Sequence, residues 1–399
     1  MQLVAYGAQD IYLTGNPQIT FFKVVYRRHT NFSMEHIQQT FKGTPGANAR
    51  VVATISRNGD LVHDCYLKFA TSALSGINYN PGHSIINNIE CEIGGQLIDR
   101  QYGHWMEAHA ELVEDKFLST TENYNMNSIH IDAVTPTDKM PGSAFQVAAG
   151  AGGTYFQNAS GGTNGFFYVP LRFWFNRHVG LSLPLIALQY HEVNINVTFS
   201  SSTAYAIVSG SPELWANYIY LDTDERRRFA QVSHEYLIEQ VQLQEFNKTT
   251  TSLTCKLNFN HPVKELVWVC DDPSNLWGST LASSLGNNPL YTSSTTVQLK
   301  LNGHDRFATQ NIDYFTRYQP MKYHPNFGFV SQTYDAIAVY SFALKPDEHQ
   351  PSGTCNFSRI DNSHLHIEGI DESKPIYLFA LSYNVLRIMN GMGGLAYSN

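Results

Sequence analysis

The most apolar long segment of the chain, residues 166–199, contains two different hydrophobic patterns. In residues 193–199 apolar side chains alternate strictly with polar ones, which predicts a β-strand with one buried face and one wet face. Residues 167–175 are aromatic and β-branched but include Pro170. Because proline has no N–H to donate to a ladder, we expect an edge or bulged strand there. Two strands separated by a bend and packed on one core indicate a β-sandwich.

Other short runs have the same β character. Gly- and Pro-rich turns separate them and no helical crossover pattern links them, which favours antiparallel sheets in sandwiches or barrels. Residues 105–118 instead have helical spacing and predict a short helix in a loop. The other predicted strands are residues 19–26, 34–41, 49–55, 62–70 and 213–222 in the first half, and 237–246, 253–259 and 263–270 in the second.

Two hairpins have the same form. Residues 89–93 alternate between apolar and polar and are followed by Gly94-Gly95, and residues 297–301 do the same before Asn302-Gly303. Both dipeptides suit the positive φ angles of a type I′ turn. A weaker echo pairs Tyr218-x-x-Leu221 with Tyr383-x-x-Leu386. We interpret these matches as traces of an internal duplication.

The duplication suggests one sandwich in each half of the chain. A chain of 399 residues is long enough for two domains. The charged segment TDERRRFAQVSHEY lies between the halves and marks the boundary. We expect an N-terminal arm over residues 1–18, a first domain over 19–222, a linker over 223–236 and a second domain over 237–399.

Composition narrows the class of function. The net charge of −8 argues against direct nucleic-acid binding, which needs basic patches to displace counterions. The 23 Tyr and 23 Phe suit strands and the cores of protein–protein interfaces. No run approaches the roughly 18 apolar residues of a membrane-spanning helix, and the N-terminus lacks the features of a signal peptide. Five widely spaced cysteines without a C-x-x-C motif predict reduced thiols in a chain made in the cytosol.

Two long polar segments, 123–165 and 271–294, are rich in Ser, Asn and Gly. Such length is unusual for a structureless loop, so we expect surface loops with a function or with mobility. Of five Asn-x-Ser/Thr sequons, only Asn158 falls in a loop that we expect to be exposed, and it is the candidate glycosylation site.

Catalytic and metal-binding motifs are missing from the sequence: there is no G-x-S-x-G, P-loop, Rossmann fingerprint or H-E-x-x-H. His104, Glu107 and His109 are potential metal ligands, but the histidines are five residues apart and do not share a helical face. The acidic run from Asp222 to Glu225 lacks the glycine and later glutamate of a calcium loop, and Arg226–Arg228 follow it. We therefore predict no enzyme activity and no catalytic, cofactor or metal site, and we read the arginines as partners of nearby carboxylates.

Four segments carry a family resemblance. PLRFWFNRHVGLSLPLIALQYHEV (170–193) resembles the signature of the major capsid proteins of nucleocytoplasmic large DNA viruses. Three more segments resemble the same family in the expected order: GAQDIYLTGNPQITFFKVVYRRHTNF (7–32), YSFALKPDEHQPSGTCNFSRIDN (340–362) and YNVLRIMNGMGGLAYSN (383–399). The chain is shorter than is usual in that family, so its loops look trimmed.

The resemblance implies an all-β fold of two tandem antiparallel eight-stranded jelly-roll sandwiches, a double jelly roll, with short helices in loops. It also implies a virion protein that forms pseudo-hexameric homotrimeric capsomers and tiles an icosahedral shell. The implied partners are further copies of itself, neighbouring capsomers, and minor capsid and penton proteins. An inner membrane would be reached only indirectly by the N-terminal arm (residues 1–17), with assembly in the host cytoplasm.

The alternative is a carbohydrate-binding or glycoside-hydrolysing jelly-roll protein, in which exposed tryptophans stack on sugars. Trp174, Trp215 and Trp268 lie within strand-like apolar runs, which favours packing in the interior, whereas Trp277 lies in a loop and stays open. Paired carboxylates for glycoside hydrolysis would meet only in space and cannot be found from the sequence.

Overall fold

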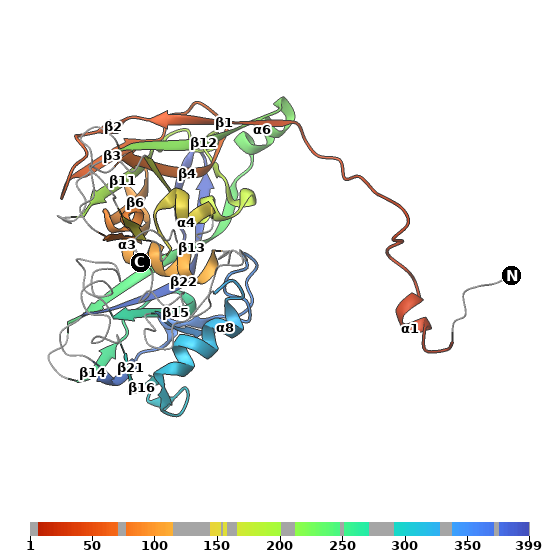
Figure 1. Ribbon diagram of the computed structural model, residues 1–399. Helices are drawn as coiled ribbons and strands as arrows, with labels where there is room; N and C mark the ends of the chain where they lie inside the picture. Colours follow the sequence, from red (N-terminus) through yellow and green to blue (C-terminus); the bar gives the residue numbers. More distant parts are fainter. Residues whose placement is uncertain are drawn as a thin grey trace.

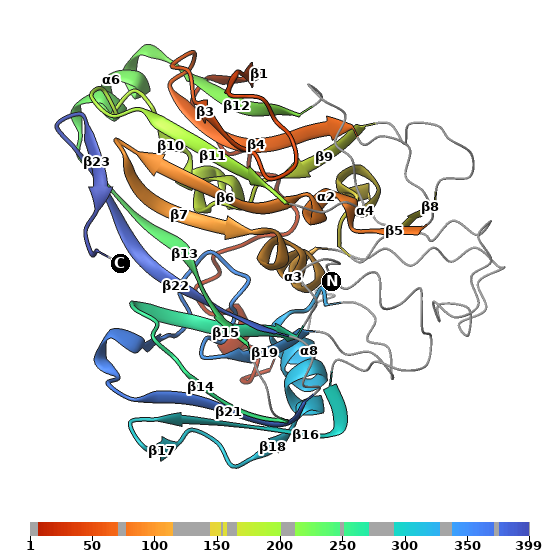
Figure 2. The same ribbon diagram turned by 90° about the vertical axis from the view of Figure 1, so that its left-hand side faces the viewer.

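The computed structural model describes residues 7–70, 77–114, 144–152, 155–157, 166–200, 212–247, 251–270, 291–327, 337–370 and 375–398 (Figure 1). These residues form two β-sandwiches stacked one on the other, each made of two antiparallel sheets (Figure 2). The all-β double jelly roll predicted from the sequence is confirmed.

The first sandwich consists of two five-stranded sheets. One has the order β1 (Phe32–Gln39), β12 (Glu213–Leu221), β4 (Leu61–Ala70) and β10 (Leu183–Pro184), with β9 (Phe166–Pro170) also on β4. The other has the order β2 (Phe41–Lys42), β3 (Arg50–Thr54), β11 (Val193–Phe199), β6 (Ile86–Ile93) and β7 (Gln96–Tyr102).

The second sandwich has a six-stranded and a five-stranded sheet. The first contains β13 (His234–Phe246), β22 (Ile376–Met389), β15 (Pro262–Cys270) and β19 (Ile337–Ser341), with β20 (Cys355–Asn356) on β15 and β23 (Met392–Leu395) on β22. The second contains β14 (Ser252–Lys256), β21 (Ser363–Ile370), β16 (Tyr291–Leu301) and β17 (His304–Asp305), with β18 (Gln310–Asn311) on β16. A separate ribbon pairs β5 (Ile77–Tyr79) with β8 (Tyr155–Gln157).

The described residues also include short helices and turns, the first of them on the N-terminal arm and the others around the sheets (Figure 1). They are α1 (Ile11–Thr14), α2 (Pro81–Ser84), α3 (Gly103–Val113), α4 (Ala144–Ala149), α5 (Trp174–Arg177), α6 (Thr223–Gln231) and α8 (Gln319–Tyr323), the π-helical turn η4 (Tyr314–Tyr318), and the 3₁₀ turns η3 (Val179–Leu181) and η5 (Phe357–Arg359). No helix in the described part of the chain is long and apolar enough to cross a bilayer.

The two sandwiches repeat one strand order. In the first sheets, β1-β12-β4 corresponds to β13-β22-β15, and in the second sheets β3-β11-β6-β7 corresponds to β14-β21-β16-β17. The predicted duplication is thus confirmed as a repeat of topology. Both predicted hairpins are present, and all four turn residues have positive φ: 59° and 81° at Gly94 and Gly95, and 51° and 79° at Asn302 and Gly303.

The tyrosine echo, in contrast, is out of register by one residue. Tyr218 pairs with Val62 next to a bulge in β4 and lies in the core of the first sandwich. At the matching bulge in β15, the residue that pairs with Val263 is Ser382, so Tyr383 lies on the opposite face of its sheet. A short sequence match cannot detect such a shift, because one residue reverses the face of a strand.

The apolar stretch that predicted a sandwich mostly has the expected structure. Within the described residues β9 pairs only with β4, as expected for a strand that contains Pro170. The predicted strand is wrong beyond Pro170, since Trp174–Arg177 form α5. β11 lies in the middle of its sheet and its apolar residues are buried, but Asn196 on the predicted wet face is buried too.

Two segments at the domain boundaries also differ from the prediction. Residues 19–26 are not a strand; the extended arm continues to residue 31, and β1 begins at Phe32. Most of the predicted linker is helix α6, and β13 begins within it at His234. Apolar patterning alone does not distinguish an extended arm from a strand, because a strand also needs a neighbour to pair with.

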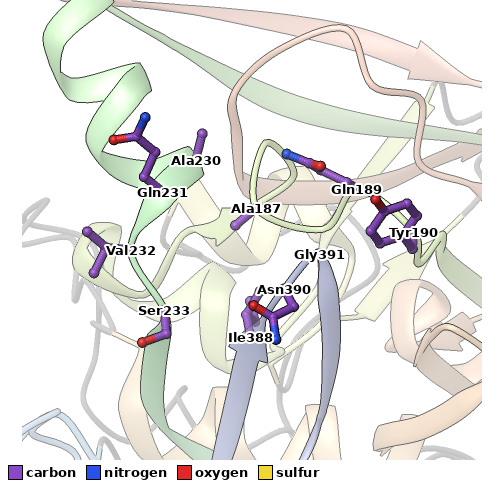
Figure 3. Close-up of a pocket in the computed structure, with 10 residues that line it drawn as sticks. All are labelled: Ala187, Gln189, Tyr190, Ala230, Gln231, Val232, Ser233, Ile388, Asn390 and Gly391. Carbon is purple, nitrogen blue, oxygen red and sulfur yellow. The ribbon is translucent and has the colours of Figure 1, made fainter.

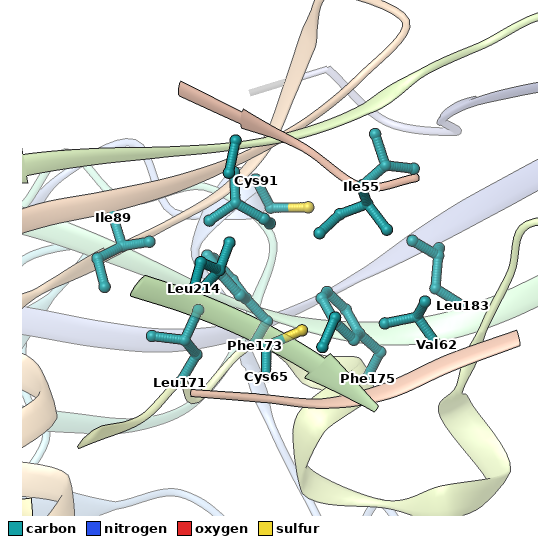
Figure 4. Packing of buried hydrophobic residues seen from close by; sticks show 14 of the residues in the cluster. Ile55, Val62, Cys65, Ile89, Cys91, Leu171, Phe173, Phe175, Leu183 and Leu214 are labelled. Carbon is teal, nitrogen blue, oxygen red and sulfur yellow. The ribbon is translucent and has the colours of Figure 1, made fainter. Parts of the chain in front are cut away.

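The core of the first sandwich is packed with aliphatic and aromatic side chains from both sheets (Figure 4). Cys65 and Cys91 lie among them as free thiols, and burial raises the pKa of Cys65 to about 12. Ile238, Leu386 and Ile388, from the ends of β13 and β22, join the same core. The second half of the chain therefore helps to complete the first sandwich.

Helix α3 fills the space between the two sandwiches. Trp105, Ala108 and Leu112 share a buried cluster with residues of β13, β15, β19 and β22. The Trp105 ring lies 5.4 Å from that of Phe379. The backbone N–H of Val241 also donates to the Asp99 carboxylate at 3.1 Å, which ties β13 to β7. The predicted helix is confirmed, but it packs between domains rather than lying in a surface loop.

Candidate assembly surfaces

The potential metal ligands on α3 have separate structural partners. The Glu107 carboxylate lies 2.6 Å from Nδ1 of His83, and both side chains are buried. His109 lies 3.2 Å from the guanidinium of Arg172. Burial lowers the pKa of His104 to about 4, so this ring is neutral at pH 7. Within the described ranges, no three His, Cys, Asp or Glu side chains gather as metal ligands.

The acidic run at the domain boundary caps a helix. The Asp222 side chain accepts from the Glu225 backbone N–H at 3.0 Å, which satisfies a free donor at the start of α6. Arg226 donates to the buried Asp60 at 2.8 Å. This part of the predicted pairing between arginines and carboxylates is confirmed.

The tryptophans do not form a sugar-stacking platform in the described residues. Trp174 and Trp268 are buried in the two cores. Trp215 is half-buried on the outer face of β12, where its ring stacks on Tyr66 and its indole N–H donates to Glu213 at 2.9 Å. Trp277 lies outside the described residues.

The sequons are distributed differently from the prediction. Asn158 lies outside the described residues, as do most of the polar segments 123–165 and 271–294. Asn31, Asn247 and Asn356 are exposed, and Asn196 is buried. The expectation that only Asn158 would be exposed is therefore wrong.

A buried ionic group connects the two sandwiches. Glu239 of β13 binds both Arg177 of α5 and Lys264 of β15, with 2.6 Å between Glu239 and the Lys264 ammonium. The ammonium also donates to the carbonyl of Pro346 at 2.6 Å. Burial by itself raises the pKa of Glu239, but the two cations outweigh it and hold the pKa below its usual value. Glu239 is therefore a charged link between a first-half helix and the second sandwich.

His324 forms a second buried ionic group nearby. Its ring lies 2.7 Å from Asp347 and 3.2 Å from Glu265. Burial alone would lower the pKa of His324, but the charge of Glu265 and the hydrogen bond to Asp347 raise it to about 9. The sequence carried one signal of these groups: Lys264-Glu265 interrupts an otherwise apolar strand.

One cavity of about 550 Å³ lies where the end of α6, residues 187–190 and the β22–β23 turn meet (Figure 3). Its lining is neutral and includes Gln189, Tyr190, Ser233 and Asn390. It holds no acid, base or cation for catalysis.

Among the residues that the structure describes, the N-terminal arm is the most exposed apolar segment. Residues 7–31 extend away from both sandwiches (Figure 1). Phe21 and Phe22 are 90% and 99% exposed. Large apolar side chains seldom remain so uncovered, and an exposed apolar segment of this kind marks a site of contact with another molecule. The sequence suggested an arm that packs on something else, but not how far it extends.

A second exposed surface covers the outer face of β1, β12, β4 and β9. We call it the open flank and define it by His36, Tyr66, Lys68, Tyr168 and Trp215. The Tyr66 ring lies 6.2 Å from Trp215, 6.0 Å from Tyr168 and 5.9 Å from His36. Lys68 pairs with Glu213 at 3.0 Å at its edge. Sequence reasoning missed this surface, because its residues come from four strands that are distant in the chain.

Comparison with known proteins gives matches over the whole chain. The family model "Major capsid protein N-terminus" matches residues 20–222, and "Large eukaryotic DNA virus major capsid protein" matches residues 225–394. The major capsid protein of Pyramimonas orientalis virus is 47% identical over 424 aligned positions, covering 100% of this chain and 99% of the relative. That of Paramecium bursaria Chlorella virus 1 is 40% identical over 463 positions, with the same coverage.

Solved structures agree. A capsid protein in the quasi-atomic model of the Paramecium bursaria Chlorella virus 1 capsid aligns with a TM-score of 0.74 at 36% identity, covering 95% of this chain and 100% of that one. The Faustovirus major capsid protein, at 13% identity and a TM-score of 0.67, shares the fold. Both sequence alignments are longer than 399 residues, so these relatives carry insertions that this chain lacks. This agrees with the short loops expected from the sequence.

Proposed function

The chain belongs to the family of major capsid proteins of large eukaryotic DNA viruses, and on that premise we propose that three copies form a pseudo-hexameric capsomer of an icosahedral shell. The protein is a structural component of the virion capsid. In the proposed capsomer the protein acts by burying surface against other copies of itself, and we propose that it has no catalytic activity.

The observation that carries the trimer is the repeated sandwich. One chain holds two lobes with the same strand order. Three such chains around a three-fold axis present six similar lobes, and a near-hexagonal block tiles a closed shell. We propose that the lobes are the predicted domains 19–222 and 237–399, joined through residues 223–236.

The N-terminal arm supplies a second kind of contact. We propose that it reaches minor capsid and penton proteins on the inner side of the shell, and an inner membrane only through them. Its exposed phenylalanines support a protein partner rather than a free tail. The net charge of −8 supports the absence of direct nucleic-acid contact. Assembly in the host cytoplasm accords with the free cysteines.

The capsomer is tested by the mass of the native protein, measured by light scattering on a sizing column. We expect a stable species of three 44.9 kDa chains that survives dilution and has a hexagonal outline in negative stain. A monomer under the same conditions would contradict the proposal.

The arm is tested by deleting residues 1–31, which end before β1. We expect an unchanged trimer that no longer co-purifies with co-expressed minor capsid proteins. The matched control replaces Gln9 and Gln18, polar arm residues, with serine and should retain binding. Retained binding after the deletion would exclude the arm as the contact.

A further inference from the structure

The internal repeat assigns a partner to the open flank. Resting on the proposed capsomer, we propose that the open flank of one copy binds the helical segment η4–α8 of a second copy. The contact would repeat, between chains, the one that α3 makes with the second sandwich inside each chain.

The strand registers define which positions correspond. In the first sandwich β12 pairs Ala216 with Cys65 and then Tyr218 with Val62, so two steps on β12 match three on β4. In the second, β22 pairs Ala380 with Leu266 and then Ser382 with Val263, again two steps against three. The same bulge therefore occurs at the same place, and short strands β10 and β20 pair beside it in both sheets.

Counting along the strands from this bulge matches the open flank to the buried face of the second sandwich. Tyr66 corresponds to Val267 because each directly follows the core residue at the end of the bulge, which is Cys65 in β4 and Leu266 in β15. The partners of these two residues, Trp215 and Phe379, correspond in turn. On the outermost strands, Tyr168 corresponds to Ile337 through their partners Lys68 and Val269.

The matched faces differ in what covers them. Val267 and Phe379 are fully buried beneath α3 of the same chain. On the open flank, Tyr168 is 43% exposed, His36 is exposed, and Tyr66 and Trp215 are half-buried. Among the described residues, one face of the repeated sheet is thus covered by a helix, and no helix covers the equivalent face.

The composition of the covered face suits a permanent contact within one chain, and that of the open flank suits a contact that forms when copies assemble. The covered face is aliphatic with phenylalanine, like a protein interior. The open flank has Tyr, Trp and His, which combine a large apolar area with polar atoms, together with the Lys68–Glu213 pair at its edge. Such residues are enriched in interfaces whose partners must be soluble before they meet.

The second sandwich offers a segment equivalent to α3. Helix α3 directly follows β7, and η4–α8 follows β17 and β18, which occupy the position of β7 in the second sandwich. Met106 of α3 packs into the core of its own sandwich, and Phe315 of η4 does the same in the second. On the side of η4–α8 away from that core, Tyr318 and Met321 are 46% and 66% exposed. These two correspond in role to the residues of α3 that cover the second sandwich.

A contact between two different surfaces joins copies head to tail, and such a contact closes into a ring when the rotation per copy is suitable. Each copy contributes one open flank and one η4–α8 segment. Contacts within a chain and contacts between chains then alternate around the ring. A three-fold capsomer with six similar lobes requires this alternation.

The test uses two variants of the full chain. The flank variant carries His36→Glu and Tyr168→Glu, and the helix variant carries Tyr318→Glu and Met321→Glu. Tyr397→Glu, an exposed tyrosine on neither surface, is the matched control. We expect each variant alone to require a protomer concentration raised by about thirtyfold or more for assembly, because buried aromatic anchors dominate interface affinity. The control should stay a trimer.

Mixing the two variants distinguishes the head-to-tail arrangement. The intact helix of the flank variant can still bind the intact flank of the helix variant, so the mixture should form a dimer of about twice 44.9 kDa that cannot close. Far-UV circular dichroism identifies a variant that fails to fold, and the milder Met321→Lys then replaces the helix variant. A wild-type trimer with trimeric variants, or a mixture that stays monomeric, would overturn the assignment while leaving the capsomer intact. A monomeric wild type would instead refute the capsomer and the assignment with it.

Discussion

Replacing Glu239 with glutamine removes the buried carboxylate that connects the sandwiches and keeps the shape of the side chain. Glu239 lies between Arg177 and Lys264, and its side chain is 8% exposed. At 2.6 Å and an effective dielectric constant of about 20, the attraction to the Lys264 ammonium is about 6 kcal/mol. This is an upper limit, because the ammonium keeps the Pro346 carbonyl and Arg177, which is partly exposed, can regain water.

We therefore expect Glu239→Gln to lower the free energy of unfolding by about 3 to 5 kcal/mol, the range for breaking a buried pair. The assay is urea unfolding followed by tryptophan fluorescence at one protomer concentration. The matched control is Glu348→Gln, which removes an ion pair of the same 2.6 Å length whose side chains are 65% and 56% exposed. Exposed pairs contribute less than about 1 kcal/mol.

A double variant separates the lost pair from the stranded charge. Adding Lys264→Met to Glu239→Gln removes the uncompensated ammonium, so stability should partly return. Because Glu239 has a pKa below its usual value, its contribution is present above the ordinary glutamate pKa and is lost as the pH falls through the lowered value. If Glu239→Gln costs no more than Glu348→Gln, the reasoning is refuted.

Three further changes test other parts of the fold. Trp105→Ala should lower the free energy of unfolding by about 3 to 5 kcal/mol in the same urea assay, because it leaves a cavity between the sandwiches, and a loss under about 1 kcal/mol would contradict the role of α3. His324 has a pKa raised to about 9, so its stabilisation is complete below about pH 6.5 and is lost as the pH rises through 9. The free energy of unfolding should therefore be lower at pH 9.5 than at pH 6, and His324→Gln should reduce this difference. An equal difference in both proteins would refute the role of His324. Gly103→Ala should destabilise more than Gly303→Ala in thermal unfolding, because its Cβ would lie 2.2 Å from the Ile86 carbonyl oxygen, whereas Gly303 has open space and only a positive φ.

Local pattern was sufficient wherever neighbours in sequence decide the structure. The Gly94-Gly95 and Asn302-Gly303 hairpins form as predicted, because two residues with positive φ define a type I′ turn regardless of what surrounds it. The helical spacing of residues 105–118 correctly predicted a helix there, although α3 begins at Gly103 and ends at Val113. Strand alternation in residues 193–199 correctly placed the apolar face in a core.

Pattern failed where the partner of a segment decides its state. Residues 19–26 have the composition of a strand, yet no strand in the described part of the chain pairs with the arm, and it stays extended. The tyrosine echo looked like a repeat, but Ser382 occupies the position of Tyr218, so Tyr383 lies on the opposite face of its sheet. The ionic group of Glu239, Lys264 and Arg177 was also not predictable, because these residues are far apart in the sequence and meet only where the two sandwiches pack together.

The sequence by itself determined the fold class, the two-fold repetition and the family, because these depend on local patterning and on long matched segments. Only the tertiary structure decided which faces are covered. A strand presents the same alternation whether its outer face meets α3 of the same chain, as at Phe379, or remains exposed, as at Tyr168. Burial depends on what lies opposite in space, and for the open flank that surface belongs, in our proposal, to another copy.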